Sequence, residues 1–298
     1  MRLPDIPAPL SPVRRPALRL PVGATDCHAH IFGPQERYPL LPDTHFVPHE
    51  NPWHDYAKML HSIGCERAVL VQPSVYGTDN SAIEDVLASR HGPDLRAIAV
   101  VAPDVPDDEL ERLHTLGFRG IRLNLAAATK GLRLEHARAL ADRVQHLGWH
   151  LQVYADFNRQ PEVGERLAAL PVPVVIDHFG RVPAAGGPAS PSFRALLRVL
   201  DSGNCWVKLS APYFVSDQFP RYADVAPMAH TLLTRSPERL LWGSDWPHAS
   251  ARERMPADAD LVDLLGTWLP DETDRWRILV DNPARLYGFT THTLETTK

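Results

Sequence analysis

The feature that most constrains the fold of this chain is a regular alternation of short apolar runs with helix-like segments. Strand candidates lie at residues 24–32, 67–72, 96–101, 118–123, 150–154, 172–177, 205–209 and 239–243. Continuous apolar runs of this length are typical of strands that are buried on both faces of a parallel sheet. Eight such units within about 265 residues predict the α/β class and a (β/α)8 barrel.

Helix candidates separate these strands, at residues 52–64, 80–90, 106–116, 134–147, 161–170, 191–202, 223–235 and 257–287. Several of them stop at a glycine, as at Gly64, Gly117 and Gly148, the residue that most often ends a helix. The structural alternative is a doubly wound open sheet. That fold carries a glycine-rich phosphate turn after its first strand, whereas the sequence Asp-Cys-His-Ala-His stands here. The barrel is therefore favoured.

The amino-terminal segment differs from the rest of the chain. Residues 1–22 contain six prolines, and such a segment cannot form a helix and has little to bury. We expect an extended arm over residues 1–22, packed on the surface or against a neighbouring subunit, and a single barrel domain over residues 23–298. The sequence leaves the oligomeric state open, with a homo-oligomer as one option.

Composition narrows the functional classes. The formal net charge is -5, so we expect neither nucleic acid nor an anionic membrane as a partner. The three cysteines are far apart, which excludes a disulfide framework and a CxxC zinc site and is typical of a reducing compartment. No apolar run approaches the roughly 20 residues of a membrane span. A cytoplasmic protein with a small-molecule ligand is the prediction.

Polar side chains gather at the carboxyl ends of the predicted strands, where barrel enzymes build their active sites. Because the eighth strand closes beside the first, we expect the residues that follow these two strands to lie close together. The set comprises Asp26, His28, His30, Gln72, Ser74, Arg122, Asn124, Tyr154, Asp156, Asp177, His178, Lys208, Ser210, Ser244 and Asp245.

Four of these residues have the chemistry of a catalytic site. His28 and His30 are two apart on an extended segment, so both rings point the same way and can hold a metal or polarise a carbonyl group. Asp245 can take a proton from water as a general base, and His178 adds a third imidazole. The structural alternatives are exposed loop histidines, a turn aspartate and a hydrogen-bonded core histidine.

Other residues at the same ends are candidates for binding. Arg122 lies within a strand and needs a partner there, either a structural carboxylate or an anionic substrate, and we favour the substrate. Ser74 and Tyr154 can each donate a hydrogen bond to a ligand, and His248 can line the rim. Asp177 is expected to point away from the site and to be structural.

Six motifs together resemble the amidohydrolase superfamily, specifically its 2-pyrone-4,6-dicarboxylate lactonase-like branch, also called amidohydrolase family 2. They are TDCHAHIFGP, VQPSVYGTDN, RGIRLN, VVIDHFGR, WGSDWPH and DNPARLYG, and they extend from about residue 24 to 289. The resemblance implies a distorted (β/α)8 barrel and the hydrolysis of a small carboxylated or hydroxylated lactone in carbohydrate or aromatic catabolism. It also implies a reaction that needs no metal, unlike most of the superfamily.

The resemblance assigns roles to single positions. It implies that Asp245 activates water while the three histidines, His28, His30 and His178, polarise the lactone carbonyl. Ser74, Arg122 and Tyr154 match substrate-contacting positions.

Two positions depart from the family pattern. Ala128 and Phe214 stand where the pyrone lactonase has further arginines, and Lys130 or Arg133 can replace only the first of these. A less charged lactone is therefore expected.

The resemblance leaves more than one activity open. The carboxyl-terminal half is similar to galactarolactone isomerases, which lack the first histidine of the pair and carry asparagine at the aspartate of the eighth strand. This chain keeps both His28 and Asp245, which favours hydrolysis. A metal-dependent decarboxylase of the same superfamily and a non-catalytic small-molecule binder also stay open.

A metal is the minority interpretation of the same residues. One divalent ion, zinc or manganese, can be held by His28, His30, His178 and Asp245. A binuclear centre is disfavoured, because the fourth strand lacks a bridging lysine and Tyr154 ends the fifth.

Overall fold

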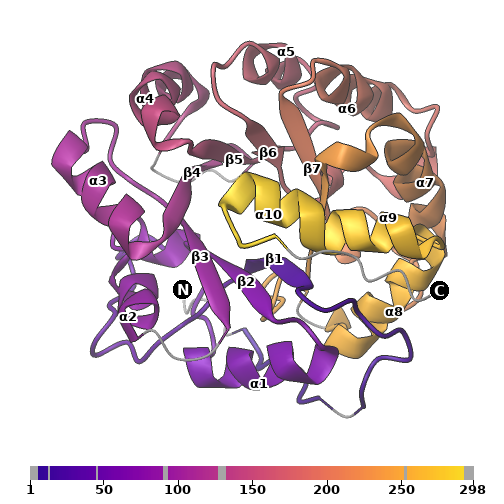
Figure 1. The fold of residues 1–298 in the computed structure, drawn as a ribbon, viewed down its shortest axis with the longest axis horizontal. Coiled ribbons are helices and arrows are strands. Elements are labelled where there is room, and N and C mark those ends of the chain that lie inside the picture. The colour runs from indigo at the N-terminus through magenta and orange to yellow at the C-terminus, as the bar shows by residue number, and fades with distance from the viewer. Residues whose placement is uncertain are drawn as a thin grey trace.

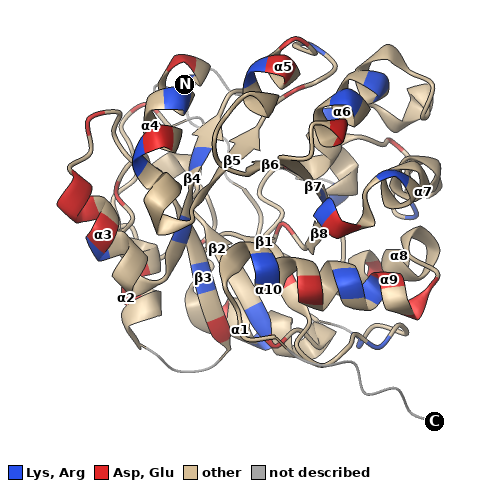
Figure 2. Ribbon diagram, turned by 45° about the horizontal axis from the view of Figure 1, so that its top comes forward, with Lys and Arg blue, Asp and Glu red and all other residues tan. Residues whose placement is uncertain are grey.

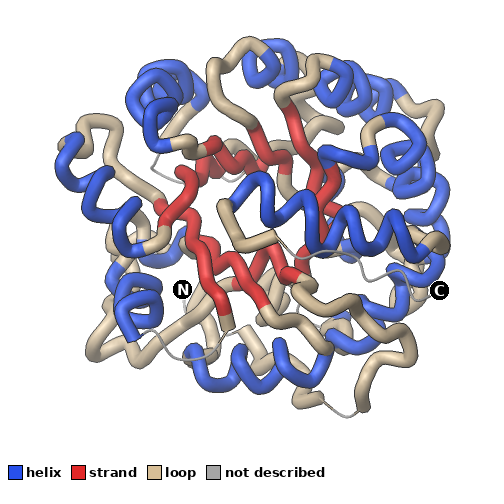
Figure 3. Tube along the Cα trace, in the orientation of Figure 1, coloured by secondary structure: helices blue, strands red, loops and turns tan. Residues whose placement is uncertain are grey.

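A computed structural model describes residues 6–12, 14–44, 46–89, 93–126, 132–251 and 254–291. Within these residues, eight strands form one sheet in the order β1 to β8 (Figures 1 and 3). All the ladders between consecutive strands are parallel, which confirms the predicted barrel. The strands are β1 (Thr25–Ala29), β2 (Arg67–Val71), β3 (Asp94–Ala99), β4 (Phe118–Asn124), β5 (His150–Tyr154), β6 (Val174–Ile176), β7 (Cys205–Ser210) and β8 (Leu240–Gly243).

The seam between the last strand and the first is held by a few backbone contacts rather than by a long ladder. Ala29 forms an isolated parallel bridge with Trp246, and the amide of His30 donates to the carbonyl of Trp246 at 2.7 Å. The buried carboxylate of Asp26 adds a side-chain link, because Oδ1 accepts from the amide of Ser244 at 2.9 Å. The barrel is thereby nearly closed, with the ends of β1 and β8 side by side.

Helices surround the barrel in the positions that the sequence predicts, with somewhat shorter ends. They are α1 (Trp53–Ile63), α2 (Ser81–Ser89), α3 (Asp107–Leu116), α4 (Ala137–Val144), α5 (Val163–Ala168), α6 (Pro191–Asp201), α7 (Ala226–Arg235) and α8 (Asp258–Trp268). The helix expected over 257–287 is interrupted after Trp268. Pro270 follows there, and a proline does not continue a helix. The remainder forms α9 (Glu272–Trp276), a π turn (Arg277–Asp281) and α10 (Asn282–Tyr287).

The strands are buried on both faces because alternate side chains enter different cores. Val69 and Val71 of β2 pack inside the barrel with Ile98, Val175 and Leu241. The residues between them, such as Ala68 and Leu70, pack outward beneath the helices. This explains why the strands read as continuous apolar runs instead of alternating ones.

The two carboxyl-terminal helices cross one end of the barrel (Figure 1). Asn282 of α10 donates to the carbonyl of Leu240, at the start of β8, at 2.8 Å. Arg96, near the start of β3, donates to the carbonyl of Gly288 at 2.8 Å. These contacts cover the amino ends of the strands, so the opposite end is where a site can form.

The described residues of the proline-rich arm contact the rest of the same chain. The amide of Ile6 donates to the carbonyl of Val47 at 2.9 Å. Further along, Arg14 pairs with Asp263 of α8 at 2.7 Å, and the amide of Leu18 donates to the same carboxylate at 2.9 Å.

The surface charge of the described residues is mixed. Figure 2 shows basic and acidic residues beside one another on α3, α6 and α9. Among these residues, no helix combines the length and apolar character needed to cross a membrane.

Candidate active site

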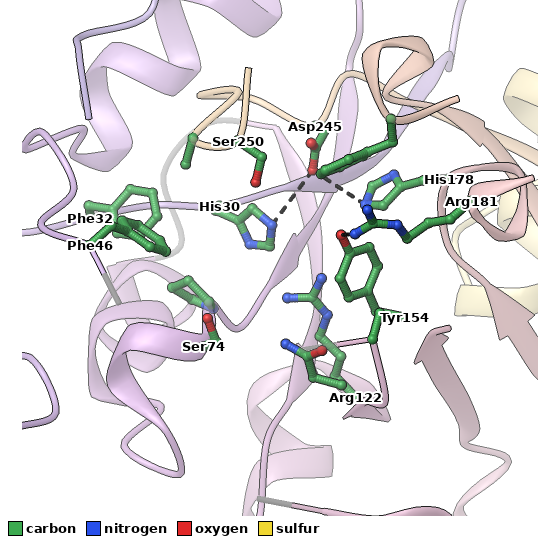
Figure 4. Close-up of a pocket in the computed structure, with 15 residues that line it drawn as sticks. His30, Phe32, Phe46, Ser74, Arg122, Tyr154, His178, Arg181, Asp245 and Ser250 are labelled. Carbon is green, nitrogen blue, oxygen red and sulfur yellow. Dashed lines mark hydrogen bonds and ion pairs between the residues drawn. The ribbon is translucent and has the colours of Figure 1, made fainter. Parts of the chain in front are cut away.

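A cavity of about 210 Å³ opens at the carboxyl ends of the strands. Figure 4 shows that side chains from distant parts of the chain converge on it. Most of the catalytic and binding candidates lie in or directly beneath its wall. The cavity is lined by His30, Phe32, Phe46, Pro73, Ser74, Arg122, Asn124, Ala126, Tyr154, His178, Arg181, Phe214, Asp245, Ala249 and Ser250.

Asp245 lies at the meeting point of the three predicted histidines. Its Oδ1 is 3.5 Å from Nε2 of His28, 3.7 Å from Nε2 of His30 and 3.7 Å from Nε2 of His178. These separations are too long for direct hydrogen bonds. An oxygen atom placed among these four groups can contact several of them at once, so the arrangement can hold a water molecule or a carbonyl oxygen.

Unusual backbone geometry aims two of these side chains. His178 and Asp245 stand two residues after the ends of β6 and β8 and have φ values of 52° and 64°. Residues other than glycine rarely adopt this left-handed region, and strained backbone of this kind is concentrated at functional sites. The turn at each strand end thus directs the side chain across the barrel mouth.

The prediction that Asp177 points away from the site is wrong. Its fully buried carboxylate lies below the cavity, where Oδ1 is 3.3 Å from Nδ1 of His28 and 3.4 Å from Nζ of Lys208. Gln152 donates to Oδ2 at 3.1 Å. Asp177 keeps an extended backbone, with φ of -71° and ψ of 146°, and so stays in phase with Val175, which packs inside the barrel, whereas the left-handed turn at His178 brings the next side chain to the site as well.

The Nδ1 atoms of the three histidines have different partners, and these partners determine what Nε2 can do. Nδ1 of His30 lies 2.7 Å from the carbonyl of Val71, which can only accept, so a neutral ring leaves a lone pair on Nε2. In this tautomer Nε2 of His30 can accept a hydrogen bond but cannot donate one. Nδ1 of His178 is 2.8 Å from Oγ of Ser210.

His28 has the most charged surroundings of the three. Its Nδ1 lies 3.2 Å from Nζ of Lys208, a buried ammonium group that also donates to Oε1 of Gln152 at 2.7 Å. Nδ1 of His28 therefore faces a donor, Lys208, and an acceptor, Asp177. A hydrogen bond from Lys208 leaves the ring proton on Nε2, whereas a hydrogen bond to Asp177 needs it on Nδ1.

Burial sets the protonation states. It raises the pKa of Asp245 to about 6, and the hydrogen bond from Tyr213 partly offsets this rise. Burial and the nearby Arg122 guanidinium lower the pKa of His30 to about 3. The pKa values of His28 and His178 are lowered well below the usual range, again mainly by burial. Near neutral pH the site therefore holds one carboxylate among neutral imidazoles.

Arg122 combines both roles considered for it. Its NH1 donates to the carbonyl of Gln72 at 3.2 Å, and its NH2 lies 3.7 Å from Asp177. The contact with Asp177 is long for an ion pair, and Nε has no hydrogen-bond partner among the residues that the structure describes. The guanidinium lines the cavity, with much of its hydrogen-bonding capacity free for an anion.

Arg181 is a site residue that the sequence reasoning missed. It donates to the hydroxyl of Tyr154, and its guanidinium carbon lies 4.9 Å from the ring centre of Phe214. Its nearest carboxylate, Asp156, is 3.9 Å away. The motif HFGR, directly after the sixth strand, was the available signal. Phe214 does occupy the cavity wall, but a guanidinium lies over it.

Tyr213 was also missed. Its hydroxyl donates to Oδ2 of Asp245, and its ring lies 5.1 Å from that of Phe214. Its place in the loop directly after the seventh strand was the only sequence signal.

Two further predictions concern the cavity rim. Ser74 lines the cavity, as expected. His248 does not: it is fully buried, and its Nε2 lies 3.0 Å from Asp258 at the start of α8. A left-handed backbone at His248, with φ of 60°, turns the ring away from the rim. Ala128 and Lys130 lie outside the described residues, and Arg133 is exposed.

The donor set fits a single metal ion by geometry. Ligand atoms of His28, His178 and Asp245 lie within 4.8 Å of one another, and Nε2 of His30 is 3.3 Å from that of His28. These residues would hold an ion such as zinc.

The charges around this set are mixed. Lys208 contacts His28 from below and Arg122 lines the cavity, while the Asp177 carboxylate lies 3.4 Å from Lys208 and 3.7 Å from Arg122. Within the part of the chain that the structure describes, β4 and β5 end in Asn124 and Tyr154, which are not the usual ligands of a second metal.

Comparisons with known proteins point to one family. Residues 25–289 match the model of the family described as Amidohydrolase. The chain is 38% identical to 4-sulfomuconolactone hydrolase of Hydrogenophaga intermedia, over 90% of each chain. It is 34% identical to 2-pyrone-4,6-dicarboxylate hydrolase of Comamonas testosteroni, over 92% of each. It is 31% identical to D-galactarolactone isomerase of Agrobacterium fabrum, over 90% of this chain and 91% of that one.

Solved structures share the architecture. A protein of Agrobacterium tumefaciens superposes with a TM-score of 0.82 at 29% identity, covering 93% of this chain and all of that one. A protein of Acinetobacter baumannii, solved with citric acid bound, superposes with a TM-score of 0.79 at 27% identity, covering 90% and 100%.

Proposed function

Because this chain belongs to the amidohydrolase family, as its motifs indicated, we propose that it hydrolyses a small lactone that carries at least one anionic group. The observation that carries the proposal is the position of the ionisable Asp245 carboxylate among three neutral imidazoles. A water molecule bound there has a base on one side and hydrogen-bonding groups on the other. Two of the relatives, named for 4-sulfomuconolactone and 2-pyrone-4,6-dicarboxylate, are hydrolases of lactones.

Asp245 is the general base in this mechanism. Its carboxylate, ionised above pH about 6, takes a proton from water beside Oδ1. The lone pair on Nε2 of His30 accepts the other hydrogen of that water, because Nδ1 of His30 is committed to Val71. The hydroxide that forms attacks the carbonyl carbon of the lactone.

His28 and His178 act on the carbonyl oxygen. In the tautomers in which Lys208 and Ser210 donate to the Nδ1 atoms of His28 and His178, both rings present an Nε2–H to the site. These groups donate to the oxygen as it becomes negative in the tetrahedral intermediate. The ring C–O bond then breaks, and Asp245 returns its proton to the leaving oxygen.

The binding groups suit a flat, negatively charged ring. Arg122 and Arg181 approach the ring of Tyr154, with guanidinium carbons 5.8 Å and 5.2 Å from its centre (Figure 4). Tyr154 and Phe214 form one wall. The sequence predicted a less charged substrate, because Phe214 stands where the pyrone lactonase has an arginine. Arg181, however, places a cation beside Phe214. A lactone with two anionic groups is therefore a substrate candidate as well.

The second candidate is isomerisation of a sugar-acid lactone. The 31% identity to D-galactarolactone isomerase, over nine-tenths of each chain, favours it. Isomerisation does not consume water, because a hydroxyl of the substrate replaces water as the nucleophile, so Asp245 could serve either reaction as the base. The two named lactone hydrolases, at 38% and 34% identity, favour hydrolysis.

The test is a panel of lactones incubated with the purified protein. The panel contains 4-sulfomuconolactone, 2-pyrone-4,6-dicarboxylate, D-galactarolactone and an uncharged lactone, and products are followed by NMR. Ring-opened acids from the anionic unsaturated lactones are expected. A shifted lactone ring from D-galactarolactone alone would support isomerisation, and no turnover of any member would reject the proposal. Metal analysis of the same sample, which we expect to show less than one bound ion per chain, accompanies the assay.

A further inference from the structure

The two oxygens of the Asp245 carboxylate have different surroundings. Oδ1 faces Nε2 of His28, His30 and His178 at 3.5–3.7 Å. Oδ2 accepts the hydroxyl of Tyr213. One oxygen is thus committed to a neighbour in the protein, while the other faces the space in which the reaction takes place.

The loop that carries Tyr213 is shaped to deliver this contact. Ala211 is fully buried and has a left-handed backbone, with φ of 47° and ψ of 60°. It leads into a single 3-10 turn, Pro212–Phe214, which is closed by a bond from the amide of Phe214 to the carbonyl of Ala211 at 3.0 Å. A non-glycine residue in this conformation is strained, so the packing around the loop must hold it there.

The ring of Tyr213 packs against two neighbouring aromatic rings. It meets His248 edge to face at 6.0 Å, and His248 is itself held by Asp258 at 3.0 Å. The ring centre of Tyr213 lies 5.1 Å from that of Phe214. Tyr213 therefore has a defined position before any substrate binds.

We propose that Tyr213 is a positioning residue for the base, in that its hydroxyl holds Oδ2 of Asp245 so that Oδ1 takes the proton from water. This inference rests on the proposed hydrolysis. Without the hydroxyl, the carboxylate is free to rotate about its Cβ–Cγ bond, and a misdirected base loses rate rather than affinity. Tyr213 does not line the cavity, so its loss should leave substrate contacts in place.

The variant that tests this is Tyr213→Phe, which keeps the ring and removes the hydroxyl. A hydrogen bond to a charged group is expected to contribute about 10- to 100-fold, so kcat should fall by that factor while KM changes less than about threefold. Tyr222→Phe is the matched control. Tyr222 is a buried tyrosine on the same side of the barrel, and its hydroxyl has no hydrogen-bond partner among the described residues. Its kcat should match that of the wild type.

A double-mutant cycle shows whether Tyr213 acts through Asp245. In the Asp245→Asn background the carboxylate is already lost, so adding Tyr213→Phe should cost no further rate. An equal loss in both backgrounds would mean that Tyr213 acts by another route, and the inference would fail. It would also fail if Tyr213→Phe kept the wild-type kcat, or if Tyr222→Phe lost as much.

A crystal structure of Tyr213→Phe gives a readout that does not depend on turnover. The Asp245 carboxylate should be rotated or present in more than one orientation. An unchanged carboxylate would overturn the inference even if the wild type hydrolyses no lactone. If the wild-type protein turns over no lactone, the proposed function is rejected. If the wild type hydrolyses a lactone and Tyr213→Phe does so at the same rate, only the role of Tyr213 is rejected.

Discussion

The backbone amide of Asp245 donates a 2.8 Å hydrogen bond to the carbonyl of His28. This bond joins the end of the last strand to the end of the first, and it places a carboxylate beside an imidazole from the opposite end of the barrel sequence. The proposed base, Asp245, and a histidine proposed to polarise the substrate, His28, are thus brought together where the last strand meets the first.

Replacing Asp245 with asparagine tests the base directly. Asp245→Asn keeps the size of the side chain but removes the proton acceptor, so kcat should fall by about 10²–10⁴-fold while substrate binding persists. Steady-state kinetics and product-inhibition constants measure the two effects. Near-full hydrolysis by the variant would contradict the mechanism and would leave the histidines or a metal to activate water.

The pH dependence of hydrolysis reports the same carboxylate. Because burial raises the pKa of Asp245 to about 6, activity should be lost as the pH falls below this value and the base becomes protonated. The kcat of the wild type, measured between pH 4.5 and 9 at constant ionic strength, should rise about tenfold per pH unit on the acid side and level off above about pH 7. A flat profile between pH 5 and 7 would contradict this assignment.

The raised pKa of Asp245 also predicts that its ionised carboxylate destabilises the folded protein. The folded pKa of about 6 lies above the ordinary aspartate value of 3.8, so folding favours the protonated form. The stabilising contribution is full below about pH 3.8 and is lost as the pH rises through about 6. Asp245→Asn should therefore raise the free energy of unfolding by about 1–3 kcal/mol at pH 8, with little gain at pH 4. Urea denaturation at both pH values measures it, and an equal change at both would contradict the linkage.

The two cavity arginines should control affinity for the substrate. Arg122→Met and Arg181→Met each remove a charge-assisted contact, which is expected to contribute about 1.5–3 kcal/mol and to raise KM about 10- to 100-fold. Arg138→Met, on the exposed face of α4, is the matched control. If Arg122→Met keeps a normal KM but unfolds at a lower temperature, Arg122 serves as a structural partner of Asp177.

Hydrolysis should survive treatment with a chelator. Lys208 and Arg122 place positive charge beside the possible ligands, and the ends of β4 and β5 lack the residues of a binuclear centre. Activity before and after exhaustive dialysis against EDTA should agree within about twofold. Loss of activity that zinc or manganese restores would show that the histidines and Asp245 hold a metal.

The sequence by itself determined the architecture and the residues that could be brought together. Apolar runs of strand length, repeated between helices, can be buried on both faces only in a parallel sheet with helices outside it. The run over residues 150–154 coincides with β5. Since the carboxyl ends of barrel strands share one mouth, the convergence of His28, His178 and Asp245 could be predicted from their positions alone.

Only the tertiary structure decided what lies on the rim and which way each side chain points. Alternation predicts direction only while the backbone stays extended, and it fails where a left-handed residue follows the strand. His178 accordingly reaches the site although Asp177 before it also points inward, and His248 turns away toward Asp258. Arg181 and Tyr213 enter the site from loops whose shape depends on packing against partners far away in the sequence. Strand pattern is a local property of the chain, whereas loop conformation depends on contacts that exist only after the barrel has closed.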